Sequence, residues 1–296
     1  MSHYLTLAIV RKNSTSSFED IMAPYDETLD VESYVFQTKE ELIKEFADDV
    51  DRRRRSHKRA LELTKEEYEE AREKEDLFYH SYTVARGPMP EGYEELNLDD
   101  PEAVYALYRR EEGEHNDFDD DGNLLSTCNP NSKWDWYTSG GRWGNQLILK
   151  NGEKADRAKA GNVDWDAMFA VTPEEAERLG DFWDEYVLGK LPPEIAALDK
   201  RGQNDYLQSK HGLTFATPNY YLGFYKTKEE YIRRQGLWST YAVVDEEGWY
   251  EPGEMGWFGV SAATADAQKD WDDNYRARFI DTLDPEDEVQ IFDCHI

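Results

Sequence analysis

A run of aromatic, glycine and cationic residues between Asn129 and Gly144 is the part of the chain best suited to bind a ligand. Large rings beside glycines are typical of places where the backbone approaches another group closely. Cations near tryptophans could bind a phosphate or stack on a nucleotide base. We therefore predict ligand-binding residues at Lys133, Trp134, Trp136, Tyr137, Gly140, Gly141, Arg142 and Trp143.

A second patch of glycines and aromatic residues, Glu254–Gly259, contains Trp257, which we expect to form another wall of this ligand site. A structural alternative also fits the first run. In that alternative Gly140 and Gly141 make a tight turn, and Arg142 pairs with a local acid such as Asp135. The sequence favours the structural alternative, and the ligand site stays a hypothesis.

The sequence contains no short motif that would identify a catalytic residue, a metal site or a cofactor site. G-x-S-x-G, G-x-G-x-x-G and P-loop motifs do not occur, and the histidines and cysteines lack metal-binding spacing. Cys294 and His295 are adjacent, so on a strand they would point to opposite faces. Asp117–Asp121 starts like a calcium loop, but Cys128 occupies the position that requires a bidentate acid. We expect a turn before a strand there, with Asp121-Gly122 at its tip.

The net charge of the chain indicates which classes of binding partner are favoured. There are 64 acidic and 34 basic residues, a net charge of -30, which repels nucleic acid and anionic membranes. A basic protein surface is a natural partner, although solubility alone would also explain the charge. The segment from Glu91 to Gly122 holds thirteen acids against two arginines. The basic run Arg52–Arg59 is interpreted as a solvated helix face paired with nearby acids, and the alternative is docking on an acidic surface of this protein or of a partner.

The cellular location follows from features that the sequence lacks. Two cysteines are too few for a disulfide framework. No signal peptide, transit sequence or long apolar run occurs. We therefore expect a cytoplasmic protein that does not span a membrane.

Buried strands at both ends of the chain frame the predicted fold. Residues 3–10 and 289–296 read as core strands, and the aromatic residues of 264–283 fall on one side of a helix. Capping boxes at Thr38 and Thr64 start helices in between. The sequence predicts a single α+β domain over 1–296 with a central, mostly antiparallel sheet, for which a ferredoxin-like order is one arrangement. Helical insertions are expected at 38–86 and, mainly helical, at 160–236.

Several segments resemble uncharacterised phage and prophage proteins. Ser126–Tyr137 followed by Gly140–Trp143 looks like a signature of that family, and Gly253–Gly259 and Asp293–Ile296 are similar to its tail. The opening strand and Ala23–Glu27 also fit, so the likeness touches both ends and the middle of the chain. It implies a phage origin and a bacterial host cell. No established activity accompanies the family, so it supplies no catalytic residues.

Two functions from different classes remain open. The first is a phage-encoded acidic inhibitor that binds a basic or nucleic-acid-handling host protein, such as a defence nuclease, by imitating the phosphate backbone. The second is a small-molecule or nucleotide-binding protein, or an enzyme, with the two aromatic patches as walls. We favour the inhibitor, a binding protein rather than an enzyme. Self-association into a homo-oligomer is left open.

Overall fold

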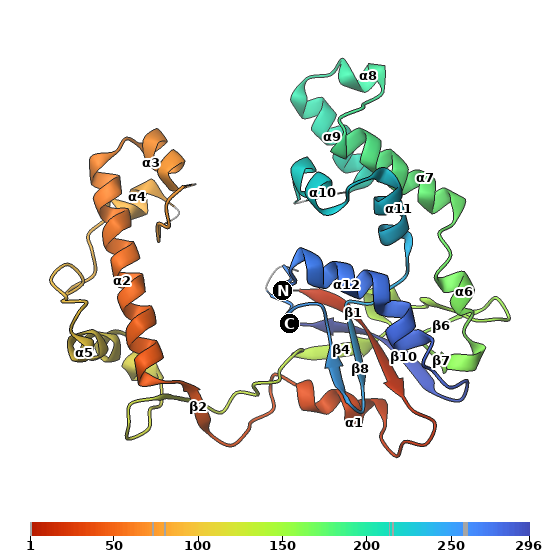
Figure 1. Cartoon of the computed structure of the whole chain (residues 1–296), viewed down its shortest axis with the longest axis horizontal. Helices are drawn as coiled ribbons and strands as arrows, with labels where there is room; N and C mark the ends of the chain where they lie inside the picture. Colours follow the sequence, from red (N-terminus) through yellow and green to blue (C-terminus); the bar gives the residue numbers. More distant parts are fainter. Residues whose placement is uncertain (1, 73, 80, 213, 215, 257–259) are drawn as a thin grey trace. The chain divides into compact units, whose positions relative to one another are not determined.

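The computed structural model describes residues 2–296, with the exception of residues 73, 80, 213, 215 and 257–259. The described residues form two compact units, which are considered separately (Figure 1). We call Met1–Leu29 with Asn129–Ile296 the sheet unit, and Asp30–Cys128 the helical unit. The helical segment expected at 38–86 belongs to the helical unit, and the one expected at 160–236 belongs to the sheet unit.

A six-stranded sheet forms the centre of the sheet unit. Its spatial order is β4 (Trp136–Ser139), β10 (Glu288–His295), β1 (His3–Val10), β8 (Ala242–Asp245) and β9 (Gly248–Tyr250), and β7 (Arg157–Lys159) also pairs with β10. β10 runs antiparallel to β1 over the whole length of both strands, from His295 opposite His3 to Glu288 opposite Val10. The sheet is mostly antiparallel, as expected of this α+β fold. One pair of its strands, β1 with β8, is parallel.

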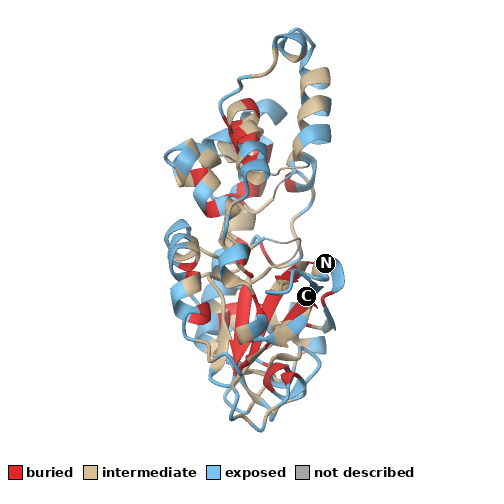
Figure 2. Cartoon of the chain, turned by 90° about the vertical axis from the view of Figure 1, so that its right-hand side faces the viewer, coloured by how far each residue is buried: buried red, intermediate tan, exposed pale blue. Residues whose placement is uncertain are grey.

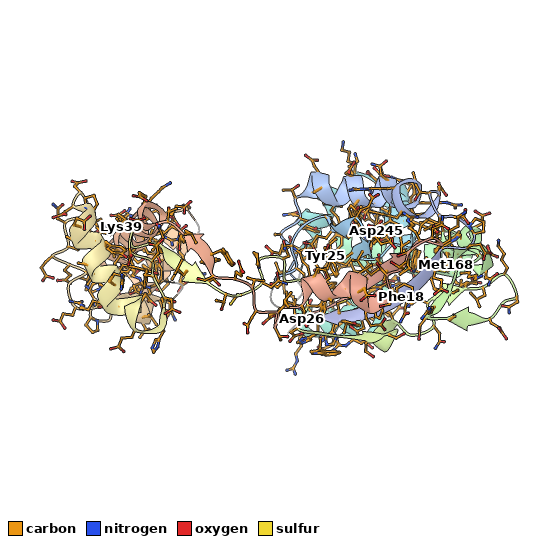
Figure 3. The ribbon with its side chains drawn as sticks, turned by 90° about the horizontal axis from the view of Figure 1, so that it is seen from below. Phe18, Tyr25, Asp26, Lys39, Met168 and Asp245 are labelled. Atoms are coloured by element: carbon orange, nitrogen blue, oxygen red, sulfur yellow. The ribbon has the colours of Figure 1, made fainter. Side chains whose placement is uncertain are left out.

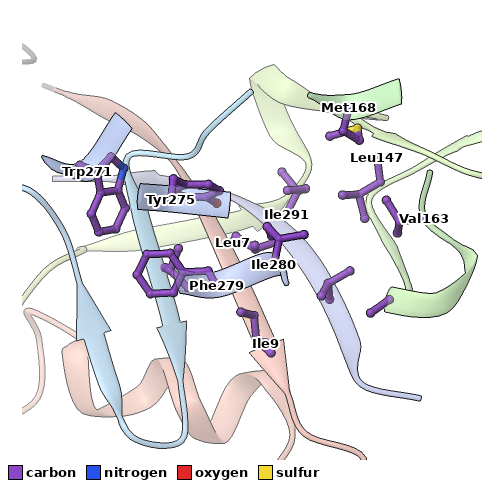
Figure 4. Close-up of a cluster of buried hydrophobic side chains, with 13 residues drawn as sticks. Leu7, Ile9, Leu147, Val163, Met168, Trp271, Tyr275, Phe279, Ile280 and Ile291 are labelled. Carbon is purple, nitrogen blue, oxygen red and sulfur yellow. The ribbon is translucent and has the colours of Figure 1, made fainter. Parts of the chain in front are cut away.

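Side chains of β1 and β10 alternate between two helical layers, because successive residues of a strand point to opposite faces. On one face, α12 (Ala265–Tyr275) and the π-helical turn η7 (Arg276–Ile280) cover the sheet. Figure 4 shows their side chains packed with those of the strands, in a cluster that includes Leu7, Ile9, Trp271, Tyr275, Phe279, Ile280 and Ile291. Burial of each such side chain contributes about 1.5–3 kcal/mol. The predicted amphipathic helix is therefore confirmed.

The other face of the sheet packs against α1 (Phe18–Met22), which is followed by the short turn η1 (Ala23–Tyr25). Phe18, labelled in Figure 3, lies in the same buried cluster as Tyr4 and Phe292. Figure 2 shows how the buried residues gather in the strands of the sheet. Both terminal strands are thus core strands in one sheet, as the sequence indicated.

Helices between the strands complete the sheet unit. An aromatic cluster of Leu179, Phe182, Trp183, Val187, Tyr225 and Tyr231 holds several of them together. They are α6 (Trp165–Met168), α7 (Pro173–Phe182), the π-helical turn η5 (Trp183–Val187), α8 (Pro193–Ala196), α9 (Lys200–His211), α10 (Pro218–Phe224) and α11 (Lys228–Gly236). Short strands β5 (Leu147–Ile148) and β6 (Lys154–Ala155) and the turn η4 (Ala160–Asn162) precede them.

The helical unit is built on one long helix, α2 (Lys39–Glu62). Capping boxes form at Thr38 and Thr64, as predicted, and start α2 and α3. Two small buried clusters support α2, one around Tyr68 and one around Val50. The remaining elements are α3 (Lys65–Arg72), α4 (Tyr82–Ala85), α5 (Pro101–Glu112), η2 (Gly113–His115) and the paired strands β2 (Tyr34–Gln37) and β3 (Leu124–Ser126).

Acids pair with the basic run of α2. Arg52 pairs with Asp49, Arg55 Nε lies 3.1 Å from Asp51 Oδ2, and Arg59 Nη2 lies 2.6 Å from Glu75 Oε1. These are the local ion pairs expected of a solvated helix face. The basic run is therefore largely neutralised within its own unit.

Candidate functional site

The predicted aromatic run divides into core and surface residues. Trp134 is only 7% exposed, and its ring meets that of Tyr137 edge-on at 4.7 Å between centroids. Tyr137 packs in turn against Phe292, and burial raises the pKa of its hydroxyl. Trp136 points to the other face of the sheet and is 44% exposed. Of these three rings, Trp136 is the one placed to meet a ligand.

Lys133 is held by an ion pair. Its Nζ lies 2.9 Å from Glu251 Oε1, and Glu251 Oε2 accepts a hydrogen bond of 2.9 Å from the indole of Trp249. The side chains of Lys133 and Glu251 are both largely buried. Since its charge is already matched, Lys133 has little capacity to bind a phosphate.

Gly140 and Gly141 make a tight turn, as in the structural alternative. Their φ angles are 66° and 50°, in the left-handed region that favours glycine. A Cβ on Gly140 would overlap the carboxylate of Asp156, and one on Gly141 would overlap the side chain of Asp293. The turn leads into η3 (Gly141–Trp143), where the backbone N–H of Arg142 donates to Asp293 Oδ2 at 3.0 Å.

The side chain of Arg142 does not form the ion pair with Asp135 that the structural alternative predicts. It is exposed and makes no ion pair with any described residue. Asp135, the expected partner, bonds to His295 instead, with 2.6 Å between Oδ1 and Nδ1. Trp143 is half-exposed, and Trp257 lies outside the described residues. The backbone of Arg142 is thus held at Asp293, while its exposed guanidinium makes no ion pair with a described residue.

Two histidine–carboxylate pairs lie where β1, β10 and β4 end together. His295 Nδ1 is bound to Asp135, and His3 Nδ1 lies 2.8 Å from Asp293 Oδ1. His3 and His295 are opposite each other in the sheet, and His295 is opposite Trp136. Because strand side chains alternate, Asp293 and His295 share a face. We call His3, Asp135, Trp136, Asp293 and His295 the strand-end cluster.

The three rings of the strand-end cluster touch one another. Trp136 stacks on His295, with 4.9 Å between centroids and 17° between planes. His3 meets His295 edge-on at 4.8 Å and Trp136 at 5.2 Å. The side chains of His295 and Asp293 are only 6% and 3% exposed. The pairs are therefore shielded from water on most sides.

The chemistry available to the cluster is proton transfer. A carboxylate that accepts from Nδ1 fixes the imidazole tautomer and leaves the lone pair on Nε2. Neither Nε2 has a hydrogen-bond partner among the described residues. The described part of the chain contains no group of three or more His, Cys, Asp or Glu residues suited to hold a metal ion. Two imidazoles with free Nε2 atoms can act as an acid and a base.

Sequence reasoning missed His3, Asp293 and the pairing of His295 with Asp135. It correctly placed Cys294 and His295 on opposite faces: Cys294 is buried on the α1 side, and burial raises its pKa to about 12. Both terminal segments were read as strands of one sheet. Pairing them antiparallel, end to end, would have brought His3 next to His295.

A second candidate surface lies in the helical unit, along α2 and beside α5. It is a groove of about 770 Å³. Its lining combines acids, aromatic rings and arginines: Glu45, Asp48, Asp49, Asp51, Asp76, Glu112, Phe46, Tyr93, Tyr108, Arg52, Arg53 and Arg55, with Gln37 and Leu42. We call it the acidic groove.

Unpaired carboxylates leave the acidic groove negative. Its acids Glu45, Asp48 and Glu112 make no ion pair with a described residue, and all three are exposed. The guanidinium of Arg53 is occupied by the ring of Phe78, 3.7 Å from its centroid. Burial, together with the charge of Glu112, raises the pKa of Tyr108, so its ring stays neutral. The groove therefore offers carboxylates beside uncharged rings.

The acidic stretch of the sequence adds to this surface of the helical unit. All of its thirteen acids are exposed except Asp119, which is half-buried. Lys39, labelled in Figure 3, pairs with Glu102 at 2.9 Å, and Arg110 pairs with Glu111 at 2.8 Å. The other acids from Glu91 to Asp121 make no ion pair with a described residue.

The calcium-like segment is a turn, as expected. Gly122 has a φ of 89° and donates its N–H to Asp119 O at 3.1 Å. Asp119 itself is occupied by Asn123 and by the backbone of Asp121. Phe118 then pairs with Leu124, so the segment leads into β3.

No family model matches the chain, and no curated protein or solved structure is similar to it. Among the helices of the described residues, none is both long and apolar enough to cross a membrane. The two candidate surfaces themselves are therefore what points to a function.

Proposed function

We propose that this protein binds a basic surface of another protein through the acidic groove and inhibits that protein by occupying the surface. The observation that carries the proposal is the groove itself, in which Glu45, Asp48 and Glu112 lack cationic partners beside Phe46 and Tyr108. Such a site suits an arginine or lysine side chain, which can bind carboxylates and lie on an aromatic face at once.

The energetics favour a guanidinium in the groove. A hydrogen bond to a charged group contributes about 1.5–3 kcal/mol, and a cation over an aromatic ring about 0.5–2 kcal/mol. One inserted arginine could therefore be a main anchor of a complex, as arginines often are at interfaces. The carboxylates gain as well, because the incoming cation relieves their mutual repulsion.

The charge of the helical unit supports long-range attraction to a basic partner. Residues 30–128 hold 29 acidic and 14 basic residues, whereas the rest of the chain, twice as long, holds 35 and 20. The net charge per residue is therefore about twice as high in the helical unit. Carboxylates spread over such a surface can occupy a groove that normally holds phosphates, and they speed encounter at low salt.

The resemblance to phage and prophage proteins suggests where the partner belongs. A phage protein acts in a bacterial cell, so the proposed partner is a host protein with a basic, nucleic-acid-handling surface. A defence protein of this kind is the candidate we favour. Inhibition would follow from competition, since the host protein could not hold nucleic acid and the acidic groove with the same residues.

The docking chemistry can be tested with a fluorescein-labelled nona-arginine peptide and fluorescence anisotropy. We expect Asp48→Lys/Glu112→Lys to weaken binding at least about tenfold, because it places two cations in the groove. The matched control is Glu66→Lys/Glu70→Lys, which changes two exposed acids of α3 outside the groove and gives the same net charge. Equal losses in the two variants would mean that binding follows net charge alone and would overturn the groove. Binding should also weaken with salt.

A further inference from the structure

We propose that the strand-end cluster is an acid–base catalytic site that hydrolyses a small phosphodiester, with His3 and His295 transferring protons and Arg142 meeting the phosphate. This activity is independent of the acidic groove, which belongs to the other unit.

The two imidazoles are oriented as proton-transfer groups. Each Nδ1 is tied to a carboxylate, at 2.8 Å for His3 and 2.6 Å for His295, so each Nε2 is left to act. A carboxylate in this position also stabilises the imidazolium that forms when Nε2 takes a proton. The ring centroids are 4.8 Å apart, so both histidines can serve one bound molecule.

Strand pairing does not require this cluster. The backbone ladder between β1 and β10 already runs from Val10 to His3, and β4 is joined to β10 by its own ladder. Burying a carboxylate such as Asp293 is costly unless it is fully bonded, and buried ion pairs are often no more stabilising than apolar residues. Residues that break a local rule of burial without a gain in stability are expected at functional sites.

Arg142 points to an anionic substrate. Its guanidinium makes no ion pair with a described residue, although acids outnumber bases almost two to one in the chain. Gly141 allows the backbone of Arg142 to approach Asp293 closely, so the exposed side chain of Arg142 starts at the edge of the cluster. A guanidinium matches a phosphate with two parallel hydrogen bonds.

Trp136 and the net charge of the chain further restrict the chemical class of the substrate. Trp136 stacks one face on His295 and is still 44% exposed, so it offers a ring to a planar group. The net charge of -30 repels long polyanions such as nucleic acids. A small phosphodiester with a planar substituent, such as a nucleotide, fits both observations.

The proposed step consumes only water. One neutral histidine takes a proton from water at Nε2, and the water oxygen forms a bond to phosphorus. The P–O bond to the leaving group breaks, and its electron pair stays on the leaving oxygen. The other histidine, protonated at the start, donates its Nε2 proton to that oxygen. Exchange of protons with solvent then restores both rings.

The test uses bis(p-nitrophenyl) phosphate and the whole chain, with release of p-nitrophenol followed over pH. We expect turnover with a bell-shaped pH profile, since one histidine must be neutral and the other protonated. His3→Asn and His295→Asn should each lower kcat/KM at least about 100-fold. His115→Asn, which changes an exposed histidine of the helical unit, is the matched control and should keep full activity.

Further variants keep the proposal testable if the histidine variants unfold. Arg142 is exposed, so Arg142→Ala should leave the melting temperature unchanged and raise KM about tenfold, with partial recovery in Arg142→Lys. Glu66→Lys/Glu70→Lys, which changes two exposed acids outside both the strand-end cluster and the acidic groove, should hydrolyse the ester normally. No release by the wild-type chain above buffer, or equal release by His3→Asn/His295→Asn, would overturn the proposal.

Discussion

The two units carry the same net charge in different ways. In the sheet unit, polar groups such as Asp293 and His295 are buried and bonded at one end of a continuous strand ladder. In the helical unit, small separate clusters hold α2, and most acids face solvent. Buried, oriented groups are suited to chemistry, whereas exposed charges are suited to attracting a partner. The two proposals accordingly place catalysis in the sheet unit and docking in the helical unit.

The largest expected effect tests the sheet core. Ile291 of β10 is fully buried in the cluster that α12 covers, so Ile291→Ala should leave a cavity and lower the free energy of unfolding by about 2–5 kcal/mol. Urea unfolding followed by tryptophan fluorescence measures it. Leu61→Ala removes an exposed side chain of α2 and should stay within about 0.5 kcal/mol of wild type. Similar losses in both would mean that the two units do not differ in packing as described.

A smaller loss is expected at the turn beside the strand-end cluster. Gly141→Ala should lower the free energy of unfolding by about 1–3 kcal/mol, because of its positive φ and the collision with Asp293. Gly152 also has a positive φ, of 84°, but has no atom within 4 Å of an added Cβ. Gly152→Ala should therefore cost only the backbone strain, about 1 kcal/mol. If thermal melting shows equal losses of stability in Gly141→Ala and Gly152→Ala, the added Cβ at position 141 does not collide with Asp293.

Acidification should weaken the helical unit through its capping boxes. Hydrogen bonds from the backbone and side chain of Thr38 lower the pKa of Glu41, and those from Thr64 lower the pKa of Glu67. A lowered folded-state pKa gives stability that is present above the unfolded value and lost as pH falls through the folded one. Helicity should therefore start to fall below about pH 4.3, the ordinary glutamate value. Circular dichroism of Glu41→Gln, compared with wild type, should show a weaker pH dependence.

The smallest expected change is in thiol reactivity. Cys128 is exposed, whereas Cys294 of β10 is buried in the cluster that includes α1, where burial raises its pKa to about 12. Iodoacetamide at neutral pH should therefore modify Cys128 and leave Cys294 untouched, because the thiolate is the reactive form. Peptide mass spectrometry identifies the modified residue. Rapid modification of Cys294 in the native chain would contradict the described packing of that face.

Local periodicity explains why much of the fold could be predicted. Strands at 3–10 and 289–296, the aromatic face of α12 and both capping boxes follow from residues close together in sequence. The turn at Gly140 and Gly141 follows from glycine chemistry. These features need no knowledge of which distant segments meet.

The sites could be predicted only in part, because they depend on distant contacts. Lys133 and Trp134 had the right chemistry, but an ion pair with Glu251 and the core around Phe292 occupy them. His3 meets Asp293 across 290 positions of sequence, which no local pattern indicates. The acidic groove likewise needs α2 and α5 to come together.

Co-purification from a bacterial host tests the proposed inhibitor most directly. Wild type, Asp48→Lys/Glu112→Lys and Glu66→Lys/Glu70→Lys would be expressed at equal levels and captured at low salt, with bound proteins quantified by isotope-labelled mass spectrometry. The account predicts a basic host protein that binds wild type and the α3 control equally and is lost from the groove variant. If every basic protein binds the groove variant as well as it binds the α3 control, docking through the acidic groove is wrong.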